Sequence, residues 1–196
     1  MANIMTTYVK IKNLDEESHK KLVDLFQTKG ETFTDEDLLP HFNKLYDRNF
    51  NDTHNFYGIS FMIDNVGSKW LTIEFGCWSF EEFKQYSDTV DLILETAWNV
   101  PTKYLEQLTS VLTEINKDII VYGTYEDESY EPIGAFVYAD DYDDIEDYDD
   151  EVDVDSMLND EEYRYETMNN LYEHRDMLLE AYLQVKQERE EDENES

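Results

Sequence analysis

The fold is decided by two neighbouring stretches, DIIVYGTYEDE (118–128) and IGAFVYADD (133–141), which are dense in β-branched and aromatic residues. Such residues favour strands. The residues from Ser129 to Pro132 have turn-forming character and separate the two stretches by the length of a hairpin turn. The sequence therefore predicts a pair of antiparallel strands, and the flanking segments must supply the rest of the sheet.

Three earlier segments have the composition of strands. They are TTYVKIKNL (6–14), KWLTIEFGCW (69–78) and TVDLILETAW (89–98). In the third, Val90, Leu92 and Leu94 fall on one face, which is the period of two that a strand requires. Residues 46–58 are rich in Asn, Asp and Gly and predict a loop.

Helices are expected between these strands. Asp15 is an N-cap for a helix that Gly30 ends, and acids follow it in the first turn, where the helix dipole favours them. A second helix begins after Thr34 and must accommodate Pro40, which either bends it or restarts it. Pro101 stands at the first position of a third helix.

The C-terminal segment predicts one long amphipathic helix. From Asn159 to Arg189 the apolar residues recur at helical spacing. Its apolar side is expected to consist of Tyr163, Met168, Leu171, Tyr172, Met177, Leu178, Tyr182 and Val185. The last residues, EREEDENES (188–196), are expected to fray.

The order strand, helix, strand, strand, helix, strand, with one further strand, predicts an α+β fold. We expect a ferredoxin-like antiparallel sheet with helices on one face, plus a long C-terminal acidic helix. Other α+β sandwiches fit the same order. The expected organisation is a ferredoxin-like domain at 1–139, an acidic segment at 140–158 and an amphipathic acidic helix at 159–196 that packs on the same domain.

Two short segments carry a resemblance to a known family. Asn65-Val66-Gly67-Ser68-Lys69-Trp70 and Thr96-Ala97-Trp98-Asn99-Val100-Pro101 resemble, in the same order, segments of the YubB-like ferredoxin-fold domain of phage and plasmid proteins. The chain departs from that pattern at Val66, where the family has an aromatic residue, and at Asn99-Val100, where it has Ser-Pro. The resemblance covers roughly residues 5–140. It implies a fold and a mobile-element origin, and no catalytic residues.

The charge of −33 is unevenly distributed along the chain. Residues 1–124 carry a net charge of −9, and residues 125–196 carry −24. Duplex DNA holds roughly one charge per 1.7 Å of axis, so this total equals that of about 56 Å of duplex. A field this negative repels nucleic acid and anionic membranes and attracts proteins with basic grooves, most of which bind nucleic acid.

The densest charge lies between Asp140 and Asp155, where eleven of sixteen residues are carboxylates and none is basic. Tyrosine, valine and isoleucine recur between the acids. The apolar positions, which are expected to anchor the run to a support, are Tyr142, Ile145, Tyr148, Val152, Val154 and Met157.

The composition of this acidic run bears on several possible functions. An EF-hand is excluded because its loop needs a glycine at the sixth position, and the run contains none. Paired catalytic carboxylates need a cleft that separates their pKa values, and these acids are expected to be exposed. A solvated charge run remains the plain alternative, as does an acidic tail that orders on a basic partner.

A DNA mimic explains the pattern best. In an extended run, acids at alternate positions lie ~6.6 Å apart, which is a phosphate-like separation. The expected partner-binding acids of the run are Asp140, Asp141, Asp143, Asp144, Glu146, Asp147, Asp149, Asp150, Glu151, Asp153 and Asp155. Those of the C-terminal helix are Glu161, Glu162, Glu166, Glu173, Asp176 and Glu180.

The sequence contains no signature of an enzyme or a cofactor site. The histidines at 19, 41, 54 and 174 lack zinc-ligand spacing, and no phosphate-binding or nucleophile motif occurs. Cys77 is the one cysteine, which excludes an intramolecular disulfide and suits a reducing cytosol. No signal pattern or long apolar run is found, so a soluble intracellular protein is expected.

The tryptophans lie near predicted strand ends, where aromatic residues can form a ligand site or close a core. Trp70, Trp98 and Pro101 stand at the ends of predicted strands, and Trp78 ends another. Aromatic residues in such places more often close a core, so we expect them to hold the sheet to its helices.

These observations predict a phage- or plasmid-type inhibitor that mimics DNA and occupies the basic groove of a host defence protein. Restriction–modification and CRISPR complexes are examples of such targets. The expected partner is a basic DNA-binding protein or complex in the host cytoplasm, with no direct binding of nucleic acid, no membrane and a possible homodimer through the terminal helix. The alternative is an interaction module that regulates a host enzyme, such as RNA polymerase or a nuclease, through apolar contacts.

Overall fold

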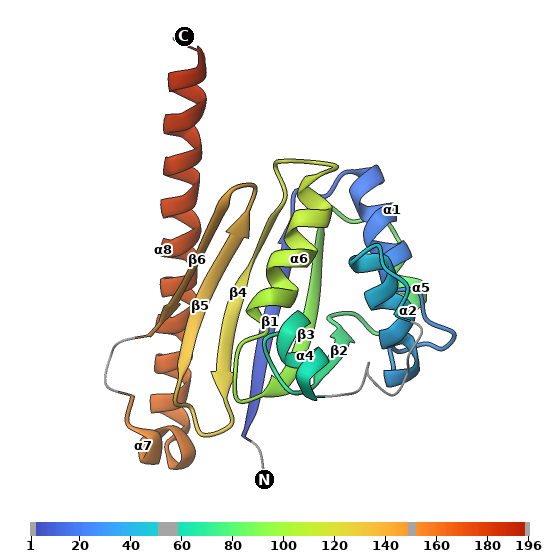
Figure 1. The fold of residues 1–196 in the computed structure, drawn as a ribbon. Coiled ribbons are helices and arrows are strands. Elements are labelled where there is room, and N and C mark those ends of the chain that lie inside the picture. The colour runs from blue at the N-terminus through green and yellow to red at the C-terminus, as the bar shows by residue number, and fades with distance from the viewer. Residues whose placement is uncertain (1–2, 51–58, 149–151, 195–196) are drawn as a thin grey trace.

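The structure is a computed structural model that describes residues 3–50, 59–148 and 152–194. These residues form an α+β fold with six strands, as Figure 1 shows. The strands are β1 (Ile4–Lys12), β2 (Leu71–Phe75), β3 (Thr89–Ala97), β4 (Ile120–Asp127), β5 (Ile133–Ala139) and β6 (Tyr142–Asp147). The helices are α1 (Glu16–Leu25), α2 (Asp35–Leu45), α4 (Ile59–Asn65), α5 (Phe80–Phe83), α6 (Thr102–Thr113), α7 (Val154–Asn159) and α8 (Glu161–Asn194).

The strands form one antiparallel sheet in the order β2-β3-β1-β4-β5-β6. The predicted hairpin of β4 and β5 is confirmed, and so are the strands at β1 and β3. The strand predicted at 69–78 is shorter, since β2 covers only Leu71–Phe75. The sheet and the long C-terminal helix confirm the predicted α+β class.

Strand β6 was not predicted as a sheet strand. Ala139 pairs with Tyr142, so Asp140 and Asp141 form a two-residue turn. Asp141 has a left-handed φ of 55°, which aspartate tolerates better than most residues other than glycine. The acids of β6 disfavour strands on their own. The strand forms because it pairs with the edge of β5. The sequence pattern of residues 142–147 alone contains no information about that edge.

The predicted helix starts hold better than the predicted ends. Asp15 accepts a 2.8 Å hydrogen bond from the Ser18 N–H and caps α1, but α1 ends at Leu25, well before Gly30. Pro40 does not restart α2, which runs through it from Asp35 to Leu45. Pro101 is the N-cap of α6 rather than its first residue.

The region predicted as a loop at 46–58 is followed by a helix that the sequence pattern did not reveal. Residues 51–58 lie outside the described part of the chain, and α4 begins directly after them at Ile59.

One face of the sheet carries the main core. Helices α1, α2, α4 and α6 lie on this face (Figure 1), and α5 contributes Phe80 and Phe83 to the same core. Phe26, Tyr104 and Phe136 are among its largest fully buried side chains.

The opposite face of the sheet is covered along β4 and β5 by α8. Leu178 and Tyr182 pack there on Ile120, Ala135 and Val137 in a second, smaller core. Figure 1 shows α8 continuing past the end of the sheet. The helix ends at Asn194, so the expected fraying from residue 188 is wrong.

The predicted apolar side of α8 is partly wrong. Leu171, Leu178 and Tyr182 are buried, whereas Tyr172 is 41% and Met177 67% exposed. A helix turns about 100° per residue, so neighbours such as Met177 and Leu178 point in very different directions. Only one side of the helix can face the sheet. The sequence pattern alone did not distinguish the apolar residues on that side from those on the adjacent sides.

Candidate acidic interface

Strand β6 divides its acids between the two faces of the sheet. Asp144 and Glu146 pair with Val137 and Ala135 and so lie on the α8 side. Asp143 and Asp147 pair with Tyr138 and Gly134 and lie on the side of the main core, with Ile145 between them. The expected spacing of ~6.6 Å therefore applies to Asp144 and Glu146, the alternate pair on one face.

Aromatic side chains of β6 and of the residue that follows it pack against α8. The rings of Tyr142 and Tyr182 lie 5.0 Å apart, and those of Tyr148 and His174 lie 5.9 Å apart. Glu146 approaches the His174 ring to 3.5 Å. The predicted apolar support of the acidic run is thus confirmed at Tyr142 and Tyr148, and at Met157, which is fully buried. Ile145, by contrast, is 39% exposed.

Asp147 is exposed, but it also takes part in a hydrogen bond within the sheet. It accepts a 2.6 Å hydrogen bond from the phenol of Tyr125, which reaches it across Gly134. Burial, together with the hydrogen bond to Asp147, raises the pKa of Tyr125 far above its ordinary value. Asp147 is thus held in one orientation at the end of β6.

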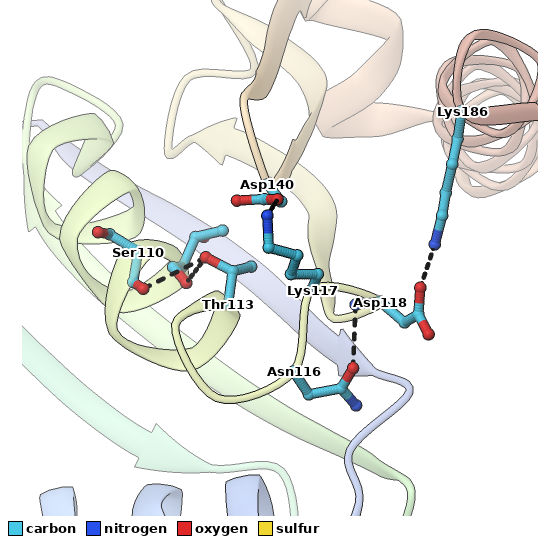
Figure 2. A network of polar contacts seen from close by, with 8 residues as sticks. Ser110, Thr113, Asn116, Lys117, Asp118, Asp140 and Lys186 are labelled. Atoms are coloured by element: carbon cyan, nitrogen blue, oxygen red, sulfur yellow. Dashed lines mark hydrogen bonds and ion pairs between the residues drawn. The ribbon is translucent and has the colours of Figure 1, made fainter. Parts of the chain in front are cut away.

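Two lysines form ion pairs that connect the loop between α6 and β4 to the acidic run and to α8 (Figure 2). Lys117, in the loop between α6 and β4, lies 3.1 Å from the Asp140 carboxylate. Lys186 of α8 pairs with Asp118 of the same loop. Burial works against the charge of Lys186, but the hydrogen bond and the charge of Asp118 outweigh it and raise the pKa of the ammonium.

The remaining acids of the run have separate places. Asp153 caps α7, where hydrogen bonds from the Ser156 hydroxyl and N–H lower the pKa of its carboxyl. Asp155 lies exposed in the first turn of that helix. The predicted positions Asp149, Asp150 and Glu151 lie outside the described residues.

The acids of α8 form the most regular charged feature. Glu162, Glu166, Glu173, Asp176 and Glu180 are all exposed. Their spacings of four, seven, three and four residues keep them on one side of the helix, opposite the buried Leu171, Leu178 and Tyr182. We call these five the outer row. Glu161 is exposed beside it.

The outer row spans ~27 Å at a rise of 1.5 Å per residue. Asp176 is partly neutralised, because Arg175 lies 2.7 Å from its carboxylate. The predicted acids are therefore distributed over more than one face of the protein. The outer row points away from the sheet, whereas the acids of β6 lie along the sheet edge.

The tryptophans do not close the core as expected. Trp98 is 45% and Trp78 95% exposed, and Trp70 is half-buried. Trp98 follows the last residue of β3 with a left-handed φ of 66°. The reversal of the chain at this point turns the indole outward, and no periodic pattern reports such a reversal.

The titratable side chains outside the acidic region are scattered. His41 is fully buried between the Leu25 carbonyl at 2.9 Å and the Tyr104 hydroxyl at 3.0 Å. Burial lowers the pKa of His41 to about 4, so the ring is neutral. His54 lies outside the described residues. In the parts of the chain that the structure describes, no three His, Cys, Asp or Glu side chains gather in a way that would hold a metal ion.

Cys77 is a free thiol of intermediate exposure, and burial raises its pKa. Among the helices that the structure describes, none combines the length and the apolar character needed to cross a membrane.

No protein-family model, curated protein or solved structure matches the chain.

Proposed function

We propose that the protein is a phage- or plasmid-type DNA mimic, which inhibits a host defence protein by occupying its basic DNA-binding groove. Restriction–modification and CRISPR complexes are the proposed targets, and the host cytoplasm is the proposed place of action. The observation that carries the proposal is the outer row of α8, with five exposed carboxylates along ~27 Å of one helix. Inhibition of this kind is competition for a groove and needs no catalytic group.

The support beneath the outer row favours this mechanism. Leu178 and Tyr182 fix α8 to the sheet, and the Lys186–Asp118 pair fixes its far part to the loop before β4. Carboxylates on a fixed helix lose less conformational freedom on binding than those of a loose tail. A rigid row therefore binds a basic groove more tightly than a disordered run of equal charge.

We infer in addition a ferredoxin-like core, related to the YubB-like domain that residues 65–70 and 96–101 resemble. The support is the strand order β4-β1-β3-β2 with antiparallel neighbours, and the helices that connect β1 to β2 and β3 to β4. Ser68 also donates a 2.7 Å hydrogen bond to the Ala97 carbonyl, so the two resembling segments meet in space.

A second candidate function is an interaction module that regulates a host enzyme through apolar contacts. It is favoured by exposed apolar side chains on one flank of α8. They are Tyr165 (70% exposed), Tyr172 (41%) and Leu183 (42%). An apolar interface persists at high salt, whereas the affinity of a charge mimic falls.

The test is a DNA-cleavage assay with purified defence complexes, namely a type I restriction enzyme and a Cas9–guide complex. The protein is added before or after the DNA. We expect inhibition of at least one complex, and only when the protein is added first. A variant with Gln at Glu162, Glu166, Glu173 and Glu180 should inhibit at least ~10-fold less.

The matched control carries the same change of charge elsewhere, with Gln at the exposed Glu17, Glu36, Glu106 and Glu114. It should inhibit as the wild type does. The proposal is wrong if neither complex is inhibited, or if the two variants lose inhibition equally.

A further inference from the structure

A cavity of about 540 Å³ opens at the end of the sheet where β1 begins and β3 and β6 end. Its lining includes Ile63, Trp98, Lys103, Tyr125, Ile145 and Asp147. This volume lies within the range of sites that bind small molecules. The cavity lies between the acidic run and the segments at 65–70 and 96–101. It is separate from the outer row of α8, which carries the proposed function.

The lining is unusual for an exposed surface. Ile63 is 42%, Trp98 45% and Ile145 39% exposed, and the three come from α4, the loop after β3, and β6. Single exposed apolar residues are common, but three large ones around one cavity mark a contact site.

Trp98 is held in place before any partner arrives. Its backbone N–H donates a 3.1 Å hydrogen bond to the Asn3 carbonyl, and the ammonium of Lys69 lies 3.6 Å from the centre of its ring. Its left-handed φ of 66° is a strained conformation for a residue other than glycine, and such strain concentrates at functional sites. An aromatic side chain that is already ordered loses little freedom on binding, which is typical of interface hot spots.

The charge at the cavity is divided between its two sides. On the β6 side, Asp143 and Asp147 flank Ile145 on the same face of the strand. On the other side, Lys103 donates a 3.1 Å hydrogen bond to the Ile63 carbonyl, and Lys69 lies over Trp98. A carbonyl oxygen and an indole ring carry no net charge and do not neutralise these lysines, so the negative charge at the cavity is confined to the β6 side, at Asp143 and Asp147.

We propose that this cavity anchors the basic partner by receiving one aromatic side chain, while flanking lysines or arginines pair with Asp143 and Asp147. The inference rests on the proposed function for the partner's basic character. It adds a contact that salt does not remove, because the aromatic ring is held by apolar burial against Ile63, Trp98 and Ile145.

The test is an NMR titration of the whole protein with two peptides of equal charge, acetyl-Lys-Phe-Lys-amide and acetyl-Lys-Gly-Lys-amide. The first should shift the indole N–H of Trp98 and the methyl groups of Ile63 and Ile145, and these shifts should persist at high salt. The second should leave those signals in place.

Two substitutions on α4 provide the matched comparison. Ile63→Ser changes a lining residue, whereas Ile59→Ser changes an isoleucine that is 58% exposed on the same helix and does not line the cavity. Ile63→Ser should weaken binding of the Phe peptide roughly fivefold, and Ile59→Ser should leave it unchanged. The anchor site is refuted if both peptides shift the cavity signals equally, if neither does, or if both variants weaken binding alike.

The outer-row Gln variant separates this inference from the proposed function. It should bind the Phe peptide like the wild type, because the outer row lies on the far side of α8. Peptide binding without inhibition of any DNA-cleaving complex would overturn the DNA mimic and leave the anchor site standing. Inhibition of a DNA-cleaving complex without peptide binding would overturn the anchor site and leave the DNA mimic standing.

Discussion

Tyr125 and Asp147 are joined by a 2.6 Å hydrogen bond that crosses the intervening strand at Gly134. A Cβ atom at position 134 would lie 2.2 Å from the Tyr125 hydroxyl and 2.3 Å from the Glu146 carbonyl oxygen. Glycine is therefore required for the phenol to reach the carboxylate. The contact ties the first part of the acidic run to the interior of the sheet.

Gly134→Ala should lower the free energy of unfolding by about 2 kcal/mol, because the methyl group displaces the Tyr125 ring or the β6 backbone. Urea denaturation measures the change. Tyr125→Phe removes only the hydrogen bond and should cost about 1 kcal/mol. An alanine variant as stable as the wild type would show that the close approach at Gly134 does not constrain the sheet.

Tyr182→Ala should loosen α8 from the sheet. Tyr182 is 4% exposed and its ring contacts that of Tyr142. Its truncation removes one of the two buried side chains that α8 contributes to the second core and costs about 3 kcal/mol. Hydrogen exchange should become faster in the α8 amides while β1 and β3 stay protected. Tyr165→Ala, at a side chain that is 70% exposed, serves as the control and should leave exchange unchanged.

His41 predicts a pH dependence of stability. Burial lowers its pKa to about 4 in the folded protein, from an ordinary value of 6.5, so the unfolded chain binds the proton more readily. The stabilisation is complete above pH ~6.5 and is lost as the pH falls toward ~4, by roughly 3 kcal/mol in all.

Wild type and His41→Gln should be compared by urea denaturation at several pH values, since glutamine does not titrate. The difference in the free energy of unfolding between the two proteins should shrink as the pH falls through this window. A gap that stays constant would mean that His41 is not held neutral by burial.

The outer row predicts a salt dependence of inhibition. For a defence complex that the protein inhibits, affinity should fall at least ~10-fold between about 50 and 200 mM salt. The outer-row Gln variant should show a shallower dependence, because four of the carboxylates that salt screens are gone. Equal slopes for the two proteins, measured by fluorescence anisotropy, would indicate that these charges do not face the partner.

Local pattern predicted the elements whose cause is local. The β4–β5 hairpin follows from β-branched composition and a turn, and α1 follows from its Asp15 cap. The apolar pattern from Asn159 to Arg189 predicted a long helix, and α8 runs from Glu161 to Asn194. The candidate site was predicted less well, because contacts with side chains far away in the sequence decide which of its acids are engaged within the protein. Asp147 accepts a hydrogen bond from Tyr125, and Asp140 pairs with Lys117. Asp147, Asp143 and the outer row are all exposed.

The amino-acid sequence by itself determined that the chain is an α+β protein, with its negative charge concentrated in the last third and a long acidic helix at its end. Periodicity and composition suffice for these properties. Only the tertiary structure decided that residues 142–147 become the sixth strand, that α8 turns its acids outward, and that Trp98 faces a cavity beside β6. The reason is that each of these depends on a surface supplied by a distant segment. Strand β6 needs the edge of β5, and α8 needs the apolar face of β4 and β5 to select which of its arcs is buried.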